Sequence, residues 1–289
     1  MTIPNLISVI IVTHQAGEHL YQVIASVLEQ ESRLELILVN NGNPFDIESK
    51  LIEKFKDTPQ VRLMTGHGDI GLVKGRNLGA RVASGDHLLF LDDHCVLPQG
   101  ALRLLADEAS KRDGPFFAGA RLVNEEDVEQ LGSRLSLLTP LIALTNLLRL
   151  GLFFPAQRLG RHRDEEPLDT EAVPAVSGAV LFCSKGLFEY FNGFDEHYFP
   201  ALAAMDLCVR YAQEGGDVLF LPSLTVTLLP KKRPRFNAEV EKRHFLAYER
   251  YFFYNFGATH TQPALWTLSI LYEGMFLLRF IFRRSTVVF

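Results

Sequence analysis

Short apolar runs alternate with helical patterns along the first part of the chain, and this alternation constrains the fold more than any other feature. Four runs have the length and β-branched content of buried strands: residues 6–12, 34–39, 61–64 and 87–91. The intervals between them space their apolar residues as helices do, at residues 20–30, 47–55 and 73–83. The order strand, helix, strand, helix predicts an α/β fold with a mostly parallel sheet and helices on both faces.

The pattern changes after residue 94, although it still fits one large domain with an appendage. Further helices and strands are expected, in chain order, at residues 100–112, 116–120, 176–183, 205–214 and 217–221. Pro222 is expected to end the last strand. From residue 239 onward the pattern is helical. We therefore predict an α/β domain over residues 1–225 and a helical extension over residues 226–289.

The fourth apolar run ends abruptly in Asp92-Asp93-His94. In open α/β sheets, ligands bind in the crevice outside the carboxyl ends of the strands. Two carboxylates and an imidazole suit a divalent ion such as Mg²⁺ or Mn²⁺, which keeps coordination positions open for phosphate oxygens. The alternative interpretation is a solvated turn after a strand.

Two other enzyme classes share part of this pattern, dinucleotide-binding proteins and nucleotidyltransferases. Gly66-His67-Gly68-Asp69-Ile70-Gly71 matches the glycine pattern of dinucleotide-binding proteins and lies between a strand and a helix. That pattern belongs to the first strand of its unit, whereas two strand–helix units precede it here. A nucleotidyltransferase would carry a basic, glycine-rich loop after the first strand, but Thr13-His14-Gln15-Ala16 stands there. Both classes therefore fit less well than a metal-dependent site at residues 92–94.

The charges of the chain are unevenly distributed. Residues 231–289 hold ten Lys or Arg and four Asp or Glu, which leaves 19 basic and 30 acidic residues in 1–230. Residues 264–282 are apolar on nearly every helical face, and Arg283 and Arg284 follow directly. We predict that the extension lies on, or inserts shallowly into, an anionic membrane surface. Packing of this helix against the rest of the protein is the alternative.

The cysteines and the N-terminus bear on the compartment. Cys95, Cys183 and Cys208 lack the spacing of a metal finger, which fits free thiols in a reducing compartment. Residues 6–12 are too short for a secretory signal, and no basic segment precedes them. We therefore expect a cytoplasmic active face, peripheral to the inner face of a membrane, and no nucleic-acid partner.

Five motifs follow one another between Ile7 and Pro222. They are Ser8-Val9-Ile10-Ile11-Val12-Thr13-His14-Gln15, Leu38-Val39-Asn40-Asn41-Gly42, Gly71 with Gly75-Arg76-Asn77-Leu78-Gly79-Ala80, Leu91-Asp92-Asp93-His94, and Gly193-Phe194-Asp195-Glu196 with Asp206-Leu207-Cys208-Val209-Arg210. In this order they resemble a family 2 glycosyltransferase with the GT-A fold, in which residues 91–94 stand at the Asp-x-Asp motif. The resemblance implies a Rossmann-like, mostly parallel sheet that binds a nucleotide sugar.

The resemblance also implies the residues of the donor site. The donor-binding residues would be Thr13, Asn41, Gly71, Arg76, Asp92 and Asp93, and Asp92 and His94 would hold Mn²⁺ or Mg²⁺. Asn41 replaces the usual acidic residue, and its amide is expected to pair with the imide of uracil or thymine. Arg76 is expected to bind the diphosphate, with a structural ion pair as the alternative. His94 replaces the second Asp, which is expected to shift the metal preference toward Mn²⁺.

An inverting displacement is implied as well, in which a carboxylate removes the proton of the acceptor hydroxyl. The family commonly has Glu-Asp where this chain has Ala203-Ala204, so Asp206 becomes the leading candidate for the base. A helix N-cap or an i,i+4 salt bridge with Arg210 is its alternative role. The substitutes are the two carboxylates of the preceding turn, Asp195 and Glu196.

Two functions remain open at this point. The first is a metal-dependent transferase that moves a sugar from a UDP- or dTDP-sugar to a saccharide or lipid-linked acceptor of the cell envelope. Residues 135–154 would then form a lid or an acceptor groove, or simply pack in the core. The second is a sugar-nucleotide-binding or scaffold subunit of a glycan assembly system that has lost its base.

Overall fold

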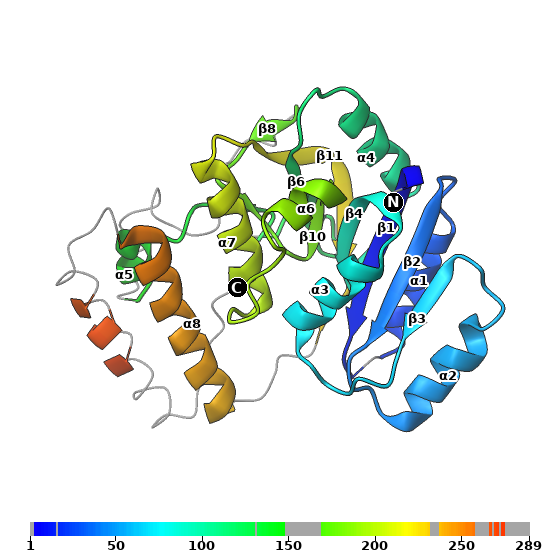
Figure 1. Cartoon of the computed structure of the whole chain (residues 1–289), viewed down its shortest axis with the longest axis horizontal. Coiled ribbons are helices and arrows are strands. Elements are labelled where there is room, and N and C mark those ends of the chain that lie inside the picture. The colour runs from blue at the N-terminus through cyan, green and yellow to red at the C-terminus, as the bar shows by residue number, and fades with distance from the viewer. Residues whose placement is uncertain are drawn as a thin grey trace.

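A nine-stranded sheet forms the centre of the protein (Figure 1). The structure, a computed structural model, describes residues 3–15, 17–130, 132–147, 169–231 and 237–257, and parts of 266–274. In chain order the strands of this sheet are β1 Ile3–Thr13, β2 Leu34–Asn40, β3 Val61–Met64, β4 Gly85–Asp92, β5 Cys95–Val96, β6 Phe117–Val123, β8 Glu171–Ala172, β10 Val180–Ser184 and β11 Val218–Leu228. A separate two-stranded sheet pairs β7 Arg134–Leu135 with β9 Ala175–Val176.

The strand order is β3-β2-β1-β4-β10-β6-β11-β5, with β8 paired to β11. Strands β3, β2, β1 and β4 run parallel, as do β6 and β11. Strand β10 lies antiparallel between β4 and β6, and short β5 and β8 are antiparallel to β11. The α/β class and the mostly parallel sheet are therefore confirmed, with β10 as the antiparallel insertion.

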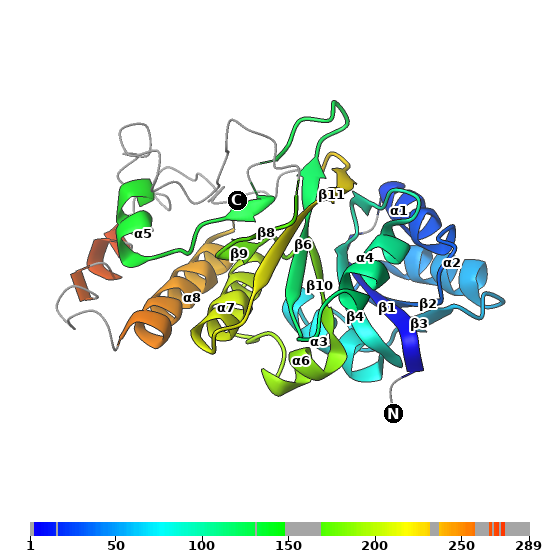
Figure 2. The same cartoon turned by 90° about the horizontal axis from the view of Figure 1, so that it is seen from above.

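Helices cover both faces of the sheet, as the sequence predicts. One face packs on α1 His19–Leu28, α2 Phe45–Phe55 and α4 Ala101–Ser110, and the other on α3 Leu72–Val82, α6 Lys185–Tyr190 and α7 Pro200–Gln213. Figure 2 shows α1 and α4 on the opposite side of the sheet from α3 and α6. In β1, Val9 and Ile11 pack on the face that α1, α2 and α4 cover. Ile10 and Val12 pack on the face that α3, α6 and α7 cover. This alternation is the two-residue period of a strand buried on both faces.

Helix α3 lies unusually close to β1, and two glycines allow it. A Cβ on Gly75 would come within 2.7 Å of a Val12 methyl, and one on Gly79 within 2.5 Å of an Ile10 methyl. The same helix carries Arg76 and Asn77 between these glycines. The close packing therefore fixes the backbone from which Arg76 extends to the carboxyl ends of the strands.

Two predicted boundaries differ from the structure by five residues or more. Strand β11 does not end at Leu221 but continues to Leu228, and its pairing with β6 shifts register between Leu221 and Thr225. Pro222 sits in that irregularity, where no ladder hydrogen bond is required of it. Helix α7 begins at Pro200, five residues before the predicted start, because proline suits the first helical turn. The proposed domain boundary at 225/226 lies inside β11 and stays a prediction.

The C-terminal region contains α8, Ala238–Phe256, which packs on α7. The segment predicted at 135–154 is described as far as residue 147 and includes α5, Pro140–Leu147; the remainder lies outside the described residues. Most of the apolar helix expected at 264–282 also lies outside them. Among the helices that the structure describes, none has both the length and the apolar character needed to cross a bilayer.

Candidate functional site

The carboxyl ends of three parallel strands bring most of the predicted donor residues to one edge of the sheet. Thr13 ends β1 beside Asn40 of β2, and Val12 lies beside Asp92 at the end of β4. Arg76 reaches the same edge from α3, because its guanidinium contacts Asp92. Five of the predicted residues thus share this edge: Thr13, Asn41, Arg76, Asp92 and Asp93.

Thr13 and Asn41 hold the edge together and present little to solvent. Thr13 is fully buried, its hydroxyl makes no hydrogen bond to the described residues, and its carbonyl accepts from the backbone of Asn41. Asn41 is 1% exposed. Its amide nitrogen donates to Asp69 over 2.7 Å, and its amide oxygen accepts from the backbone of Ile70 over 3.0 Å. The amide on which the predicted base contact depends is therefore already occupied by the loop before α3.

Gly71, the third predicted donor residue, begins α3 with a positive φ of 86°. Its backbone N–H donates to Asp69 Oδ1 over 2.9 Å. Asp69 therefore connects the end of β2 to the first turn of α3. The roles of Thr13, Asn41 and Gly71 toward a donor stay predictions.

Arg76 and Asp92 form a short, largely buried ion pair. The guanidinium nitrogen Nη2 lies 2.6 Å from Asp92 Oδ1, and the side chains are 4% and 31% exposed. The guanidinium also lies over the Phe194 ring, 5.8 Å from its centroid. Its Nη1 is buried and has no hydrogen-bond partner among the described residues. This orphaned donor is available to an anionic oxygen of a ligand.

Asp93 lies between two potential cations. Its Oδ1 is 2.8 Å from Lys231 Nζ and 3.6 Å from His94 Nδ1. Burial raises the pKa of the Asp93 carboxyl, but its contact with His94 and the charge and hydrogen bond of Lys231 outweigh this, and the net pKa is lowered. Lys231 follows β11, and the backbone of Leu229 donates to the His94 carbonyl, which ties this segment to the motif.

The residue types at the motif fit a divalent ion in their chemistry. Asp92 retains an exposed fraction of 31%, and His94 Nδ1 is buried without a hydrogen-bond partner among the described residues. Carboxylate oxygen and imidazole nitrogen are ligands that Mn²⁺ accepts. In the described part of the chain no three His, Cys, Asp or Glu side chains converge on one point. A bound ion would therefore draw its other ligands from a donor or from water.

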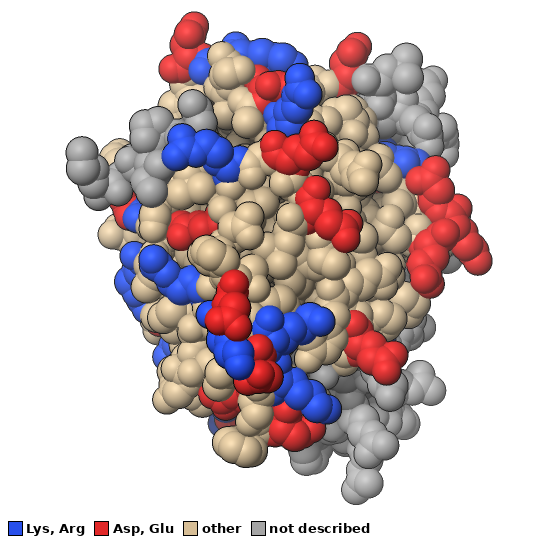
Figure 3. Space-filling model, turned by 90° about the vertical axis from the view of Figure 1, so that its right-hand side faces the viewer, with Lys and Arg blue, Asp and Glu red and all other residues tan. Residues whose placement is uncertain are grey.

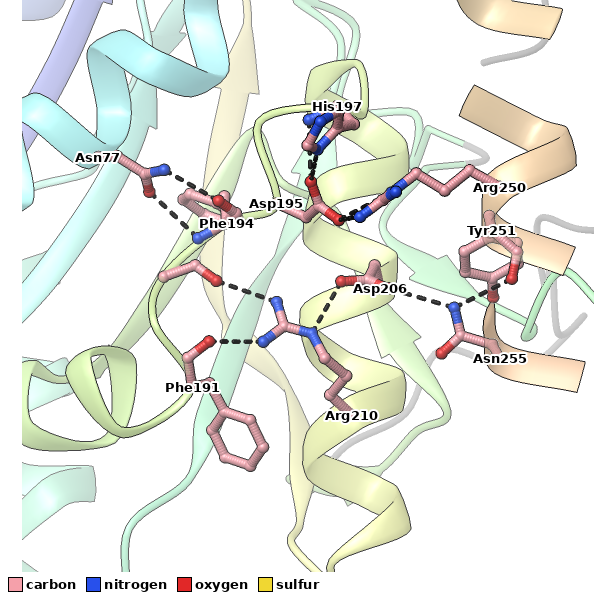
Figure 4. A network of polar contacts seen from close by, with 11 residues as sticks. Asn77, Phe191, Phe194, Asp195, His197, Asp206, Arg210, Arg250, Tyr251 and Asn255 are labelled. Atoms are coloured by element: carbon pink, nitrogen blue, oxygen red, sulfur yellow. Dashed lines mark hydrogen bonds and ion pairs between the residues drawn. The ribbon is translucent and has the colours of Figure 1, made fainter. Parts of the chain in front are cut away.

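A second polar network lies between α3, α7 and α8 (Figure 4). Asn77 of α3 bonds both backbone groups of Phe194 and also donates to Glu196 over 3.1 Å. Asp195 accepts from His197 and pairs with Arg250 of α8 over 3.2 Å. Burial raises the pKa of the Asp195 carboxyl, but the His197 hydrogen bonds and the Arg250 charge outweigh this, and the net pKa is lowered. A carboxylate held in this way is a poor proton acceptor.

Asp206, the predicted base, makes the ion pair with Arg210 that the sequence offered as its alternative, and its role as a base stays a prediction. It is 1% exposed, and its Oδ2 pairs with Arg210 over 2.8 Å in the i,i+4 arrangement. Its Oδ1 accepts from Asn255 of α8 over 3.2 Å. Burial raises the pKa of the Asp206 carboxyl, although the Arg210 charge and the Asn255 hydrogen bond oppose this. Both oxygens are thus engaged inside the protein, which the sequence could not show because Asn255 lies 49 residues away.

The alanines that replace the acidic pair are buried close to Arg76. Ala203 and Ala204 are both 0% exposed. A Cβ built on Gly178 would lie 2.8 Å from the Ala204 Cβ and 3.2 Å from Arg76 Nη1, so these three residues are neighbours. Position 204 therefore lies beside Arg76 at the donor edge, and it contributes no carboxylate there.

The family follows from a direct comparison. Residues 8–164, more than half of the 289-residue chain, match the family described as glycosyl transferase family 2. The chain belongs to glycosyl transferase family 2. The matched region contains the ends of β1, β2 and β4, so the family 2 assignment rests on the part of the chain that forms the donor edge.

Relatives of this family 2 chain include enzymes that transfer different sugars. Polypeptide N-acetylgalactosaminyltransferase 12 of Mus musculus is 26% identical over 198 residues, which cover 67% of this chain and 34% of the relative. N-acetylglucosaminyl-diphospho-decaprenol L-rhamnosyltransferase of Mycobacterium tuberculosis is 24% identical over 243 residues, which cover 77% and 75%. The chain thus spans about a third of the mouse relative's length.

Solved structures confirm the GT-A type of α/β fold. The crystal structure of GalNAc-T7 with UDP, GalNAc and Mn²⁺ superposes with a TM-score of 0.61 at 18% identity, over 93% of this chain and 54% of that one. The mannosyltransferase PcManGT from Pyrobaculum calidifontis, in complex with GDP-Man and Mn²⁺, gives 0.58 at 14% identity, over 97% and 76%. The two neighbours hold different bases, so the fold does not determine the base.

Sequence reasoning missed two residues of the site, Asp69 and Lys231. Asp69 appeared only as a variable position of a glycine pattern, and Lys231 only as one base of a basic extension. An acid two residues before Gly71 was a signal for the first, because position 41 lacks the usual acid and a second acid nearby could replace it. No local pattern connects Lys231 to a motif 138 residues earlier.

Proposed function

We propose that this chain transfers a sugar from a nucleotide-sugar donor to a saccharide or lipid-linked acceptor, with the help of a divalent ion. One observation carries the proposal: Arg76, with an unpartnered buried donor, lies 2.6 Å from Asp92 where the parallel strands end. The named activities of the relatives and the Mn²⁺ in two structural neighbours support it. The donor is a UDP- or dTDP-sugar, and the acceptor belongs to the cell envelope.

The side chains of the donor edge have distinct tasks in this proposal. Arg76 binds a diphosphate oxygen through Nη1 and stays oriented because Asp92 holds Nη2. Asp92 and His94 hold the ion, which when bound neutralises charge that develops on the leaving diphosphate. The ionised Asp93 keeps Lys231 at the same edge, so a second fixed positive charge lies close by.

Glu196 is the carboxylate we assign to the acceptor proton in an inverting displacement. Asp206 is enclosed by Arg210 and Asn255, and Asp195 is paired with Arg250. Glu196 is exposed, and Asn77, the neighbour of Arg76 on α3, donates to it. It therefore combines access to an acceptor with a position beside the donor edge.

Removal of the divalent ion tests the proposed transfer directly. We expect EDTA to lower the release of nucleoside diphosphate from a UDP- or dTDP-sugar by about 100-fold or more, and Mn²⁺ to restore it. The assay uses the full chain, a panel of sugar nucleotides and saccharide acceptors, and chiral or NMR analysis of the anomeric product. Melting temperature with EDTA serves as the control for folding. If the protein binds a nucleotide but turns over no donor with any acceptor of the panel, even with Mn²⁺, this result supports the scaffold alternative instead.

The C-terminal region supports a peripheral position on an anionic membrane. Trp266 and Ile270 are 57% and 65% exposed and lie four residues apart, so they share one helical face. Tyr254 at the end of α8 is 69% exposed. Exposed aromatic and aliphatic side chains, in a region whose sequence carries more bases than acids, are the features that interfacial helices use. We propose that this face contacts the inner leaflet, where lipid-linked acceptors are found.

Replacing Trp266 and Ile270 together by serine should weaken vesicle binding about 10-fold, because two large apolar contacts are removed. Sedimentation with phosphatidylserine vesicles measures this. Phe45→Ser is the matched control, since Phe45 is 84% exposed on α2, at the other end of the molecule (Figure 1). The face on that side mixes both signs of charge (Figure 3). Equal pelleting of all three proteins would refute the membrane contact.

A further inference from the structure

Asp69 is held in one position at the donor edge, next to Asn41. Its Oδ1 accepts two hydrogen bonds, from the Asn41 amide over 2.7 Å and from the Gly71 backbone over 2.9 Å. Gly42 packs directly beneath it: a Cβ on Gly42 would come within 2.8 Å of the Asp69 Cβ, and its φ is +75°. Side-chain and backbone contacts therefore fix the Asp69 carboxylate before any ligand arrives.

The orientation of the Asn41 amide follows from its neighbours. The backbone N–H of Ile70 can only donate, so the amide atom that faces it must be the oxygen. The amide nitrogen then points to Asp69 and donates to it. Asn41 is only 1% exposed, so its amide presents almost no surface to a base, and the exposed carboxylate that it holds is left for this task.

Asp69 retains one oxygen for a ligand. The side chain is 56% exposed, and no described residue donates to its Oδ2. His14 Nδ1 lies 3.9 Å from this oxygen but is itself paired with the Asn41 carbonyl over 2.8 Å. Both lone pairs of Oδ1 are used, whereas Oδ2 remains a charged acceptor that faces solvent at the end of the sheet.

We propose that Asp69 reads the base of the donor by accepting the imide N–H of uracil or thymine at Oδ2. This inference rests on the proposed function. Asp69, in the loop before α3, takes the place of the acidic residue that position 41 lacks. Cytosine presents a lone pair where uracil presents its imide N–H, so it meets the carboxylate with repulsion. Guanine presents two adjacent donors, and a single available oxygen leaves one of them unpaired.

Asp69→Asn tests the assignment with almost no change in shape. In this variant the remaining side-chain oxygen should keep the two hydrogen bonds from Asn41 and Gly71. The exposed atom is then the amide nitrogen, which donates a hydrogen bond where the carboxylate oxygen accepted one. We therefore expect affinity for UDP to fall about 10-fold or more and the CDP:UDP affinity ratio to rise by at least as much. Calorimetric titration of the full chain with UDP, CDP and GDP, each with Mn²⁺, measures both.

Asp46→Asn is the matched control, because it removes an exposed carboxylate from the first turn of α2 without touching this cluster. It should leave the CDP:UDP ratio unchanged. An Asp69→Asn protein that folds and keeps the wild-type ratio would overturn the inference. A wild type that prefers GDP would overturn it as well but leave the transferase proposal intact, whereas a wild type that binds no nucleotide would end both.

Discussion

Arg76→Met is expected to lower sugar transfer by about 100-fold to 1000-fold, because it removes a preorganised charge from the site of the leaving diphosphate. The guanidinium is 4% exposed, held by Asp92 over 2.6 Å, and lies over the Phe194 ring. A steady-state assay of nucleoside diphosphate release measures the loss. Arg76→Lys should recover only part of the rate, since an ammonium keeps the charge but cannot bond Asp92 and a phosphate oxygen in one plane.

The control must separate chemistry from folding, since a partner of a buried ion pair is being removed. Arg76→Met leaves Asp92 unpaired and should cost about 2 kcal/mol of stability. Arg76→Met with Asp92→Asn removes both charges and should regain most of this stability without regaining activity. Arg81→Met, an exposed position in the last turn of the same helix, should change neither quantity. Full activity of a folded Arg76→Met protein would remove Arg76 from the donor site.

The parallel part of the sheet, β1 to β4, could be predicted from the sequence because each of these strands carries its own signal, whereas the short β5 and β8 carry none. The apolar runs of β1, β2 and β4 end at polar residues, and parallel strands bring such ends to one edge. The contact between Arg76 and Asp92 could be expected for the same reason, because both residues belong to motifs that the strands and α3 bring to that edge. Local pattern and global fold agree at these positions.

Several hydrogen-bond partners of Asn41 and Asp206 could not be predicted, because they lie far along the chain. The Asn41 amide is oriented by Asp69 and Ile70, which lie 28 and 29 residues later. Asp206 is enclosed by Asn255, from a helix whose sequence pattern gives no indication of its packing partner. Hydrogen-bond direction is a tertiary property, so a motif can place a residue at the right edge without showing which partners its side chain bonds.

Asp206→Ala should destabilise the protein by about 3 kcal/mol or more, because it leaves the Arg210 guanidinium without its carboxylate and unties α8 from α7. Asp206→Asn retains an acceptor for Arg210 and should cost less. The pKa of the Asp206 carboxyl is raised in the folded protein, so its contribution to stability is fully present below the unfolded pKa. That contribution is lost as pH rises through the folded pKa. The stability difference between wild type and Asp206→Asn, measured by urea unfolding, should therefore be larger at pH 4 than at pH 7.

Glu196→Gln is the counterpart that separates a proton acceptor from a structural carboxylate. The amide oxygen of glutamine can still accept from Asn77, so the melting temperature should not change. Turnover should fall by about 100-fold or more, because the group that takes the acceptor proton has lost its basicity. The substitutions at the two carboxylates thus have opposite expected results. Those at Asp206 should lower stability and leave turnover intact, whereas Glu196→Gln should lower turnover and leave stability intact. If Asp206→Asn abolishes turnover in a folded protein while Glu196→Gln remains active, the base belongs at Asp206, and the network around it must open during catalysis.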